Sequence, residues 1–273
     1  MPVSTVDIER YYDTQQVFYT HLWSRSALHY GLWYPETKTL REAIKNTDRL
    51  MTHLLDIRRD DIVLDAGCGV GGSCFHIAES TRAHVEGITL SGVQLAIARR
   101  SCKQLGLETR VNFSRQDFCQ TDFKDMSFSK VFGIESISHA LQKADFVAEA
   151  YRLLMYGGRL GVCDAFLARD DPAIAEDLTY KRFLQGWALP NLVSRTSFTT
   201  LLRGAGFKEI VFHDLSDLIA RSINRIYLHG LWTHPFSVLK ALLGAARRDY
   251  PARYQKSLFD HGELVYGIYL AHK

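Results

Sequence analysis

The stretch VLDAGCGVGG, from Val63 to Gly72, constrains the fold of this chain more than any other. Its apolar run reaches Asp65 and then passes into a series of glycines, a pattern that predicts a strand, a tight turn and a helix. Glycine allows positive φ and close approach of a ligand to the backbone. Ligands of open α/β sheets bind beyond the carboxyl ends of the strands. The stretch therefore predicts a small-molecule site, although an ordinary strand–helix turn has the same pattern.

Strand and helix patterns alternate after this point. Strands are expected at 61–67, 84–90, 111–117, 128–136, 159–166, 208–216 and 263–273, and helices at 39–57, 72–80, 92–107, 143–158 and 194–207. The helix at 143–158 is expected to end at Gly157 and Gly158. This order is typical of right-handed βαβ units. It predicts an α/β, Rossmann-like fold with a seven-stranded, mostly parallel sheet and helices on both faces.

The chain is expected to have a cap and two lid insertions around this core. Residues 1–56 include an aromatic-rich segment and form a predicted N-terminal helical cap, and residues 57–273 form the core. Mostly helical stretches interrupt the core at about 168–195 and 217–260. Insertions of this kind in an α/β domain are natural lid or substrate-pocket elements.

The glycine-rich stretch also carries a family resemblance. Its motif D-A-G-C-G-x-G resembles the first signature of class I S-adenosylmethionine-dependent methyltransferases. A lone G-x-G is weak and also suits pyrophosphate binding in dehydrogenases. The resemblance implies S-adenosyl-L-methionine as cofactor, with its amino-acid part and ribose against Gly67, Cys68 and Gly69. It implies that the Asp65 carboxylate orders this loop.

The next stretch narrows the resemblance. GITLSGVQ, which ends at Gln94, is similar to cyclopropane-fatty-acid synthases and to tocopherol and sterol C-methyltransferases. In that group neutral side chains bind the cofactor, which implies this role for Thr89 and Gln94, with Leu90 against the adenine. A dehydrogenase expects an acidic residue where Thr89 stands. A surface position on the helix is the alternative for Gln94.

Further cofactor contacts follow from the same resemblance. RQDFCQ resembles an adenine site, in which Asp117 accepts the exocyclic amine and Phe118 covers the ring; a turn-forming Asp is the alternative. Ile134, at the end of the fourth strand, and His29 and Tyr30, in the predicted cap, complete the set of cofactor-binding candidates. The cap segment could instead only complete the core.

The candidate catalytic residues are Glu135, His139 and Tyr12. GIESISHA resembles the E-x-x-x-H stretch of sterol and tocopherol methyltransferases, which implies that Glu135 faces the transferred methyl group. His139 suits a catalytic or a structural histidine equally. Tyr12 belongs to an N-terminal pattern of paired tyrosines that resembles the cap of the sterol enzymes.

Two chemistries fit these residues. An alkene acceptor becomes a carbocation, which a carboxylate and aromatic faces stabilise. A hydroxyl or amine acceptor needs only proximity or a base such as His139. The resemblance favours C-methylation of an isoprenoid or similar alkene. The aromatic candidates are Tyr11, Tyr12, Trp23, Phe183, Trp187, Tyr227 and Trp232.

Charge and composition limit the partners. The 33 basic and 30 acidic residues give a net charge of +3, which disfavours nucleic acid as a substrate. We expect a small hydrophobic acceptor, possible homo-oligomers and no stable membrane insertion. The lid is mixed basic and apolar, which suits an isoprenoid diphosphate or a merely solvated helix face. Its basic residues are Arg221, Arg225, Lys240, Arg247, Arg248, Arg253 and Lys256.

The remaining patterns give no second site. The eleven histidines and five cysteines show no metal-ligand spacing, so no metal is expected, and the thiols suit buried reduced cysteines. Neither a signal peptide nor a transmembrane run is recognised, which favours a cytoplasmic location. A non-catalytic protein that binds S-adenosylmethionine is the alternative from outside the enzymes.

Overall fold

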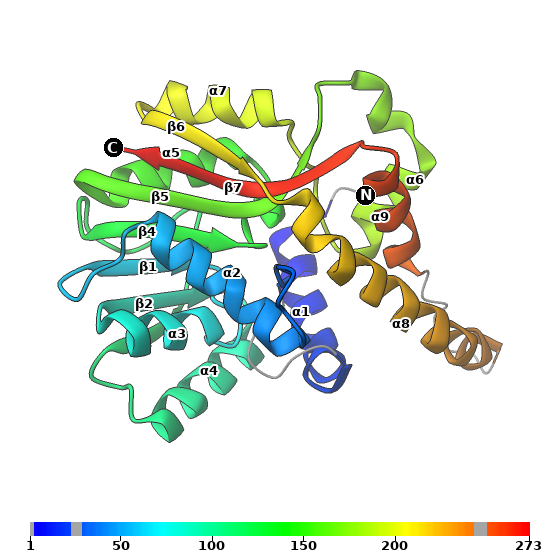
Figure 1. The fold of residues 1–273 in the computed structure, drawn as a ribbon, viewed down its shortest axis with the longest axis horizontal. Coiled ribbons are helices and arrows are strands. Elements are labelled where there is room, and N and C mark those ends of the chain that lie inside the picture. Colours follow the sequence, from blue (N-terminus) through cyan, green and yellow to red (C-terminus); the bar gives the residue numbers. More distant parts are fainter. Residues whose placement is uncertain (1–2, 23–28, 243–249) are drawn as a thin grey trace.

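A computed structural model describes residues 3–22, 29–242 and 250–273, with the side chains of 15–22 and 232–242 left out (Figure 1). Within these ranges seven strands form one sheet: β1 (Ile62–Ala66), β2 (His84–Thr89), β3 (Val111–Arg115), β4 (Phe128–Ile134), β5 (Leu154–Leu167), β6 (Lys208–Asp214) and β7 (Leu264–His272). The helices are α1 (Thr5–Leu22), α2 (Leu40–Leu54), α3 (Gly72–Thr81), α4 (Gly92–Leu105), α5 (Lys143–Leu153), α6 (Leu178–Gly186), α7 (Arg195–Ala205), α8 (Ser216–Leu242) and α9 (Pro251–Asp260).

The sheet has the order β3-β2-β1-β4-β5-β7-β6. Strands β1 to β5 are parallel, and β7 runs antiparallel between β5 and β6. The chain therefore reverses its winding direction between β1 and β4. The carboxyl ends of these two strands diverge into loops there, which is the point at which open α/β sheets bind their ligands. The predicted Rossmann-like α/β class is confirmed.

Helices cover both faces of the sheet. One apolar cluster joins it to α2, α3 and α4 through residues such as Met51, Ile77 and Ala98. A second cluster joins the opposite face to α5 and α7 through residues such as Phe146 and Phe198. These clusters fix the strand ends in place and so position the loops beyond them.

One local prediction was wrong. The helix predicted at 143–158 ends at Leu153, and Leu154 to Gly158 open strand β5 instead. Leu154 is fully buried against β4 while the following turn projects from the sheet, so pairing with β4 overrides the helical pattern. In the first lid stretch, Pro172–Glu176 form a 3-10 helix, and the α-helix begins only at Leu178.

The lid packs beyond one end of the sheet. In Figure 1, α6, α8 and α9 lie together on the side away from α3 and α4, and α1 stands between the two groups. A Cβ on Gly230 of α8 would lie 1.5 Å from the Tyr250 ring, and one on Gly186 would lie 2.2 Å from Pro251. These close approaches hold the three lid helices against one another.

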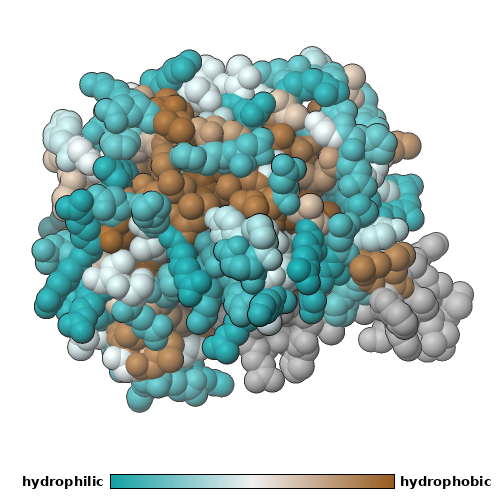
Figure 2. Space-filling model, in the orientation of Figure 1, coloured by the Kyte–Doolittle hydropathy of each residue, from teal (hydrophilic) through white to brown (hydrophobic). Residues whose placement is uncertain are grey.

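The face seen in Figure 2 is largely hydrophilic, with apolar residues showing in a band above α2 and again on the outer part of α8. On α8, Leu228 and Leu231 are exposed. Even so, no helix in the described part of the chain has the length and apolar content needed to cross a membrane. Four cysteines are buried and Cys119 is partly buried, and all five are free thiols.

Candidate active site

A cavity of about 1510 Å³ lies beyond the carboxyl ends of the parallel strands, between the core, α1 and the lid. It exceeds the roughly 300–1,000 Å³ of most ligand pockets. All fifteen predicted site residues line it: Tyr12, His29, Tyr30, Asp65, Gly67, Cys68, Gly69, Thr89, Leu90, Gln94, Asp117, Phe118, Ile134, Glu135 and His139. The structure thus brings these residues together, while their individual roles stay predictions.

The loop after β1 is held tightly against the loop after β4. The Ser136 hydroxyl donates to the Ala66 carbonyl at 2.6 Å. Gly67 has φ +115°, and a Cβ there would lie 2.3 Å from the Ser136 Cβ. Only glycine satisfies both the conformation and the space at this position. The two loops that flank the switch point therefore form one rigid wall.

Gly69 leaves its side of the cavity open. It has φ +52°, and the nearest atom to a Cβ at this position would be Gln94 Nε2 at 3.9 Å. Gln94 is buried rather than on the helix surface, and its Oε1 accepts a hydrogen bond from the Thr89 hydroxyl at 3.0 Å. A neutral hydroxyl–amide pair thus faces the bare backbone of the glycine loop, whereas Glu86 points away and binds Asn112.

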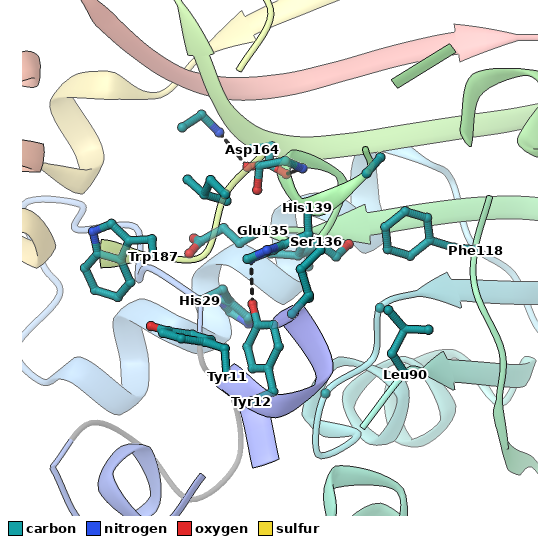
Figure 3. Close-up of a pocket in the computed structure, with 18 of the residues that line it drawn as sticks. Tyr11, Tyr12, His29, Leu90, Phe118, Glu135, Ser136, His139, Asp164 and Trp187 are labelled. Carbon is teal, nitrogen blue, oxygen red and sulfur yellow. Dashed lines mark hydrogen bonds between the residues drawn. The ribbon is translucent and has the colours of Figure 1, made fainter. Parts of the chain in front are cut away.

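The end of the cavity next to the glycine loop is lined by the apolar side chains of Leu90 and Phe118. Figure 3 shows Leu90 and Phe118 at one end, Trp187 and Tyr11 at the other, and Glu135 with His139 between them. Asp117 does form the turn after β3, because its Oδ1 accepts from Cys119 N at 2.8 Å, and it also lines the cavity. Asp117 can therefore form the turn and still be available to the adenine of a bound cofactor.

Asp65 lies buried beneath the glycine loop. Burial raises the pKa of its carboxyl to about 7, against the opposing effect of a hydrogen bond from the Cys74 thiol at 3.2 Å. The Gly67 N–H binds the Asp65 backbone carbonyl at 3.1 Å, so backbone as well as side chain organises this turn.

Glu135 is the central ionisable group of the cavity. It sits at the end of β4 with φ +51°, and its Oε1 accepts from Tyr30 N at 2.6 Å and from the Tyr266 hydroxyl at 2.7 Å. Burial is the main cause that raises its pKa to about 7, while the charge of His29 and these two hydrogen bonds oppose the rise. Both of these bonds use the same oxygen, and the Glu135 side chain lines the cavity.

His29 supplies a fixed positive charge near Glu135. Burial alone would lower its pKa, but the hydrogen bond and charge of Asp48, together with the charge of Glu135, raise it to about 9. His29 Nε2 lies 3.4 Å from Asp48 Oδ1, and its Nδ1 lies 2.9 Å from the Tyr30 carbonyl. The protonated ring can donate to both acceptors.

His139 is a neutral acceptor. Burial lowers its pKa to about 4, so the ring carries one proton at neutral pH. Its Nδ1 lies 3.3 Å from the Ala188 carbonyl, which places the proton there, and its Nε2 lies 2.8 Å from the Tyr12 hydroxyl. Burial raises the Tyr12 pKa well above 10, so the phenol donates to the ring. This bond ties α1 across the cavity to the loop after β4.

The sequence analysis missed several wall residues. Asp164 lies within β5, three residues before its end, and accepts from Ser138 N at 2.8 Å; it also falls inside the strand expected at 159–166, so its position alone gave no signal. Tyr266 on β7 and Gln255 on α9 also line the cavity. No pattern in the sequence marks these two, because they depend on strand register and on helix packing.

Some proposed wall residues lie elsewhere. Tyr227 does not line the cavity, and its ring stacks on Tyr250 at 5.9 Å between centroids. None of the described lid cations lines it either: Arg221 lies over Trp33, Arg253 over Tyr254, and Lys256 pairs with Asp260. Trp23, Arg247, Arg248 and the side chains of Trp232 and Lys240 lie outside the described residues.

These features fit S-adenosylmethionine. The glycine loop offers bare backbone at Gly69, the Thr89–Gln94 pair offers neutral hydrogen bonds, and Leu90 and Phe118 offer flat apolar contact for a purine. The remaining volume suits a second, hydrophobic molecule. Within the described ranges, no group of three metal-ligating side chains is placed to hold an ion.

Comparison with known proteins decides the family. The sequence model of the family called mycolic acid cyclopropane synthetase matches residues 3–217. The chain belongs to this family. The predicted resemblance to S-adenosylmethionine-dependent methyltransferases of this group is thereby confirmed.

Curated relatives agree. The chain is 29% identical over 211 residues to sterol 24-C-methyltransferase of Saccharomyces cerevisiae, a match that covers 76% of this chain and 54% of the relative. It is 31% identical over 211 residues to 27-O-demethylrifamycin SV methyltransferase of Amycolatopsis mediterranei, covering 77% of this chain and 76% of the relative. The chain thus spans only about half the length of the yeast sterol enzyme.

Solved structures share the fold over nearly the whole chain. The cyclase SpnF superposes with a TM-score of 0.82 at 23% identity, covering 100% of this chain and 98% of that one. A geranyl diphosphate methyltransferase complex gives a TM-score of 0.77 at 19% identity, covering 98% of both chains. At these identities the likeness concerns the fold alone.

Proposed function

We propose that this methyltransferase of the mycolic acid cyclopropane synthetase family methylates an alkene carbon of an isoprenoid or similar hydrophobic acceptor. The observation that carries the proposal is Glu135, a buried carboxyl with a pKa near 7 that faces the cavity between its two ends. The sterol 24-C-methyltransferase and cycloartenol-C-24-methyltransferase relatives support C-methylation, as does the fold shared with geranyl diphosphate methyltransferase.

The cofactor end holds and orients the methyl donor. S-adenosylmethionine supplies an electrophilic methyl group on a sulfonium. The backbone at Gly69, the Thr89–Gln94 pair and the Asp117–Phe118 turn would hold this cofactor. Because its reacting end must lie where the acceptor also reaches, the central part of the cavity near Glu135 is the site of transfer.

Glu135 then stabilises the product of the first step. An alkene carbon that attacks the methyl group would form a new C–C bond as the methyl–sulfur bond breaks and its electron pair leaves with S-adenosylhomocysteine, and the neighbouring alkene carbon would become a carbocation. The ionised carboxylate lowers the energy of that cation in a site that excludes water. Faces of Tyr11, Tyr12 and Trp187 add cation–π stabilisation of about 0.5–2 kcal/mol each.

Loss of a proton completes the reaction. Glu135 accepts a proton from a carbon next to the cation, the C–H electrons form a new alkene, and the carboxyl is left protonated. A pKa near 7 suits this task, because the group is ionised often enough to accept the proton and releases it again to solvent.

O-methylation is the second candidate. The chain covers 76% of the rifamycin relative and 87% of an O-methyltransferase of Aspergillus nomiae, more than it covers of the sterol enzymes. The Tyr12–His139 pair could in principle draw a proton from an acceptor hydroxyl. A pKa of about 4 makes His139 a weak base, which favours the alkene chemistry.

Product analysis tests the proposal. The protein is incubated with methyl-labelled cofactor and a panel of terpenoid, sterol and phenolic acceptors, and each labelled product is examined by NMR for a new C–CH₃ or O–CH₃ bond. A C–CH₃ product supports the alkene reaction, and only O–CH₃ products refute it. Calorimetry with S-adenosylhomocysteine and with NAD provides the control for the cofactor.

A further inference from the structure

Gln255 on α9 is a buried amide that lines the cavity, and within the described residues its Oε1 has no hydrogen-bond partner. Its exposed fraction is 5%, and its Oε1 is among the buried polar atoms without a partner. Buried polar side chains almost always have partners, and an unmade bond destabilises the folded state.

Trp187 is a second such group on the same lid. It follows α6 directly, lines the cavity, and its Nε1 is also buried without a partner in the described part of the chain. In Figure 3 its indole lies at the end of the cavity remote from Leu90 and Phe118. Trp187 therefore lies on the acceptor side, and Gln255 belongs to α9, which packs against the helix that precedes Trp187.

The lid helices hold these two groups in a fixed relation. A Cβ on Gly186 would meet Pro251 at 2.2 Å, so α6 and the start of α9 are in direct contact. Phe183 of α6 and Tyr254 of α9 share one apolar cluster. A fixed pair of polar groups in an apolar wall is the usual arrangement by which a pocket orients a hydrophobic ligand.

Among the described residues, the wall contributed by α8 and α9 holds no lysine or arginine, and it includes the imidazole of His229. The described cations of α8 and α9 make their contacts elsewhere, with Arg221 over Trp33 and Lys256 bonded to Asp260. An amide and an indole N–H offer hydrogen bonds but no charge to offset a phosphate. They suit an uncharged oxygen.

We propose that Gln255 and Trp187 form a subsite for an uncharged oxygen, a hydroxyl or carbonyl, on the acceptor. The acceptor is then an oxygenated lipid such as a terpenoid alcohol or sterol, with its oxygen at the lid and its reacting carbon near Glu135. This inference rests on the proposed function, because it assigns the same cavity to an isoprenoid-like acceptor.

Binding of three matched probes tests the subsite. The protein saturated with S-adenosylhomocysteine is titrated by calorimetry with farnesol, with the hydrocarbon that lacks its hydroxyl, and with farnesyl diphosphate. Farnesol should bind at least about tenfold more tightly than the hydrocarbon, and Gln255→Met should reduce that preference to about twofold or less. Gln104→Met is the matched control, since Gln104 is exposed on α4 and does not line the cavity.

A thermal measurement tests it without any acceptor. Because Gln255→Met removes an unpaired buried amide from the free protein, its Tm should rise by about 2–6 °C. A fall in Tm would mean that the amide has a structural partner, and it would overturn the proposal. Trp187→Phe keeps an aromatic side chain but removes the indole N–H. It should also reduce the preference for farnesol over the hydrocarbon.

The two proposals fail in different ways. Equal binding of farnesol and hydrocarbon, or tightest binding of the diphosphate, overturns the subsite and leaves methyl transfer intact. Absence of methyl transfer to every acceptor, with the farnesol preference still present, overturns the proposed function and leaves the subsite.

Discussion

Replacing Glu135 by glutamine should stabilise the protein while removing its activity. Glutamine has nearly the same shape, and its amide oxygen can still accept from Tyr30 N and the Tyr266 hydroxyl. The substitution removes only the ionisable group. Because burial raises the pKa of Glu135 from 4.5 to about 7, the ionised form destabilises the folded state by about 3 kcal/mol.

The sign of the pH dependence follows from proton uptake. Between pH 4.5 and 7 the folded protein binds more protons at Glu135 than the unfolded chain does, so stability falls as the pH rises through this window. The full destabilisation by the ionised Glu135 carboxylate is present above pH 7 and absent below pH 4.5. Glu135→Gln should therefore raise Tm by roughly 5–10 °C at pH 8.5 and by little at pH 5.

Turnover should move in the opposite direction. Without the carboxylate the cation loses its nearest counter-charge and the base that accepts its proton, which together predict a loss of about 10²–10⁴-fold in kcat. Affinity for S-adenosylhomocysteine should change less than about threefold. Glu86→Gln is the control, since Glu86 is a partly buried carboxyl outside the cavity, bonded to Asn112.

Thermal denaturation from pH 5 to 8.5 and single-turnover methyl transfer are the two assays. The reasoning is refuted if Glu135→Gln lowers Tm at pH 8.5, because the carboxylate would then stabilise the fold. Retention of turnover within tenfold would show that the carboxylate takes no part in the transfer.

Three further substitutions have defined outcomes. His29→Gln removes the charge that lowers the pKa of Glu135, so the acid limb of the pH–rate profile should move to higher pH, and Tm should fall more at pH 6 than at pH 9.5. Gly69→Ala puts a Cβ into the cavity at φ +52° and should weaken S-adenosylhomocysteine binding about tenfold in calorimetry. Tyr12→Phe breaks the bond to His139 and should lower kcat less than tenfold for an alkene acceptor.

Each of these has a control or a contrary result. Gly92→Ala, at which a Cβ meets nothing within 4 Å, should leave cofactor affinity unchanged. A loss of more than 100-fold in Tyr12→Phe would favour proton removal from a hydroxyl acceptor. An unshifted profile in His29→Gln would mean that its charge is screened from Glu135.

The cofactor side of the cavity could be predicted because its residues directly follow strands. Asp65, Thr89, Asp117 and Glu135 each end or follow one of four parallel strands, whose carboxyl ends share one edge of the sheet. The strand pattern in the sequence was therefore enough to predict that these four residues lie close together. Asp164 lies inside β5 rather than at its last residue, so the same rule does not single it out.

The acceptor side could not be predicted in the same way. Tyr266 faces Glu135 only because β7 pairs antiparallel with β5 in the register Tyr266 to Ala165, and a shift of one residue would turn it to the other face. Gln255 depends on how α9 packs against α6. Such contacts join segments distant in sequence and leave no local pattern.

The position of β7 has a consequence for biosynthesis. This strand lies between β5 and β6 although the ribosome makes it after both, and it delivers the Tyr266 hydroxyl to Glu135. Until β7 emerges, the nascent sheet has no strand between β5 and β6. The Glu135 carboxyl then lacks the Tyr266 hydroxyl, one of its two hydrogen-bond donors. Translation that halts before residue 264 thus yields a chain in which Glu135 lacks its Tyr266 donor, so the transfer site that we propose is completed only with the last strand of the sheet.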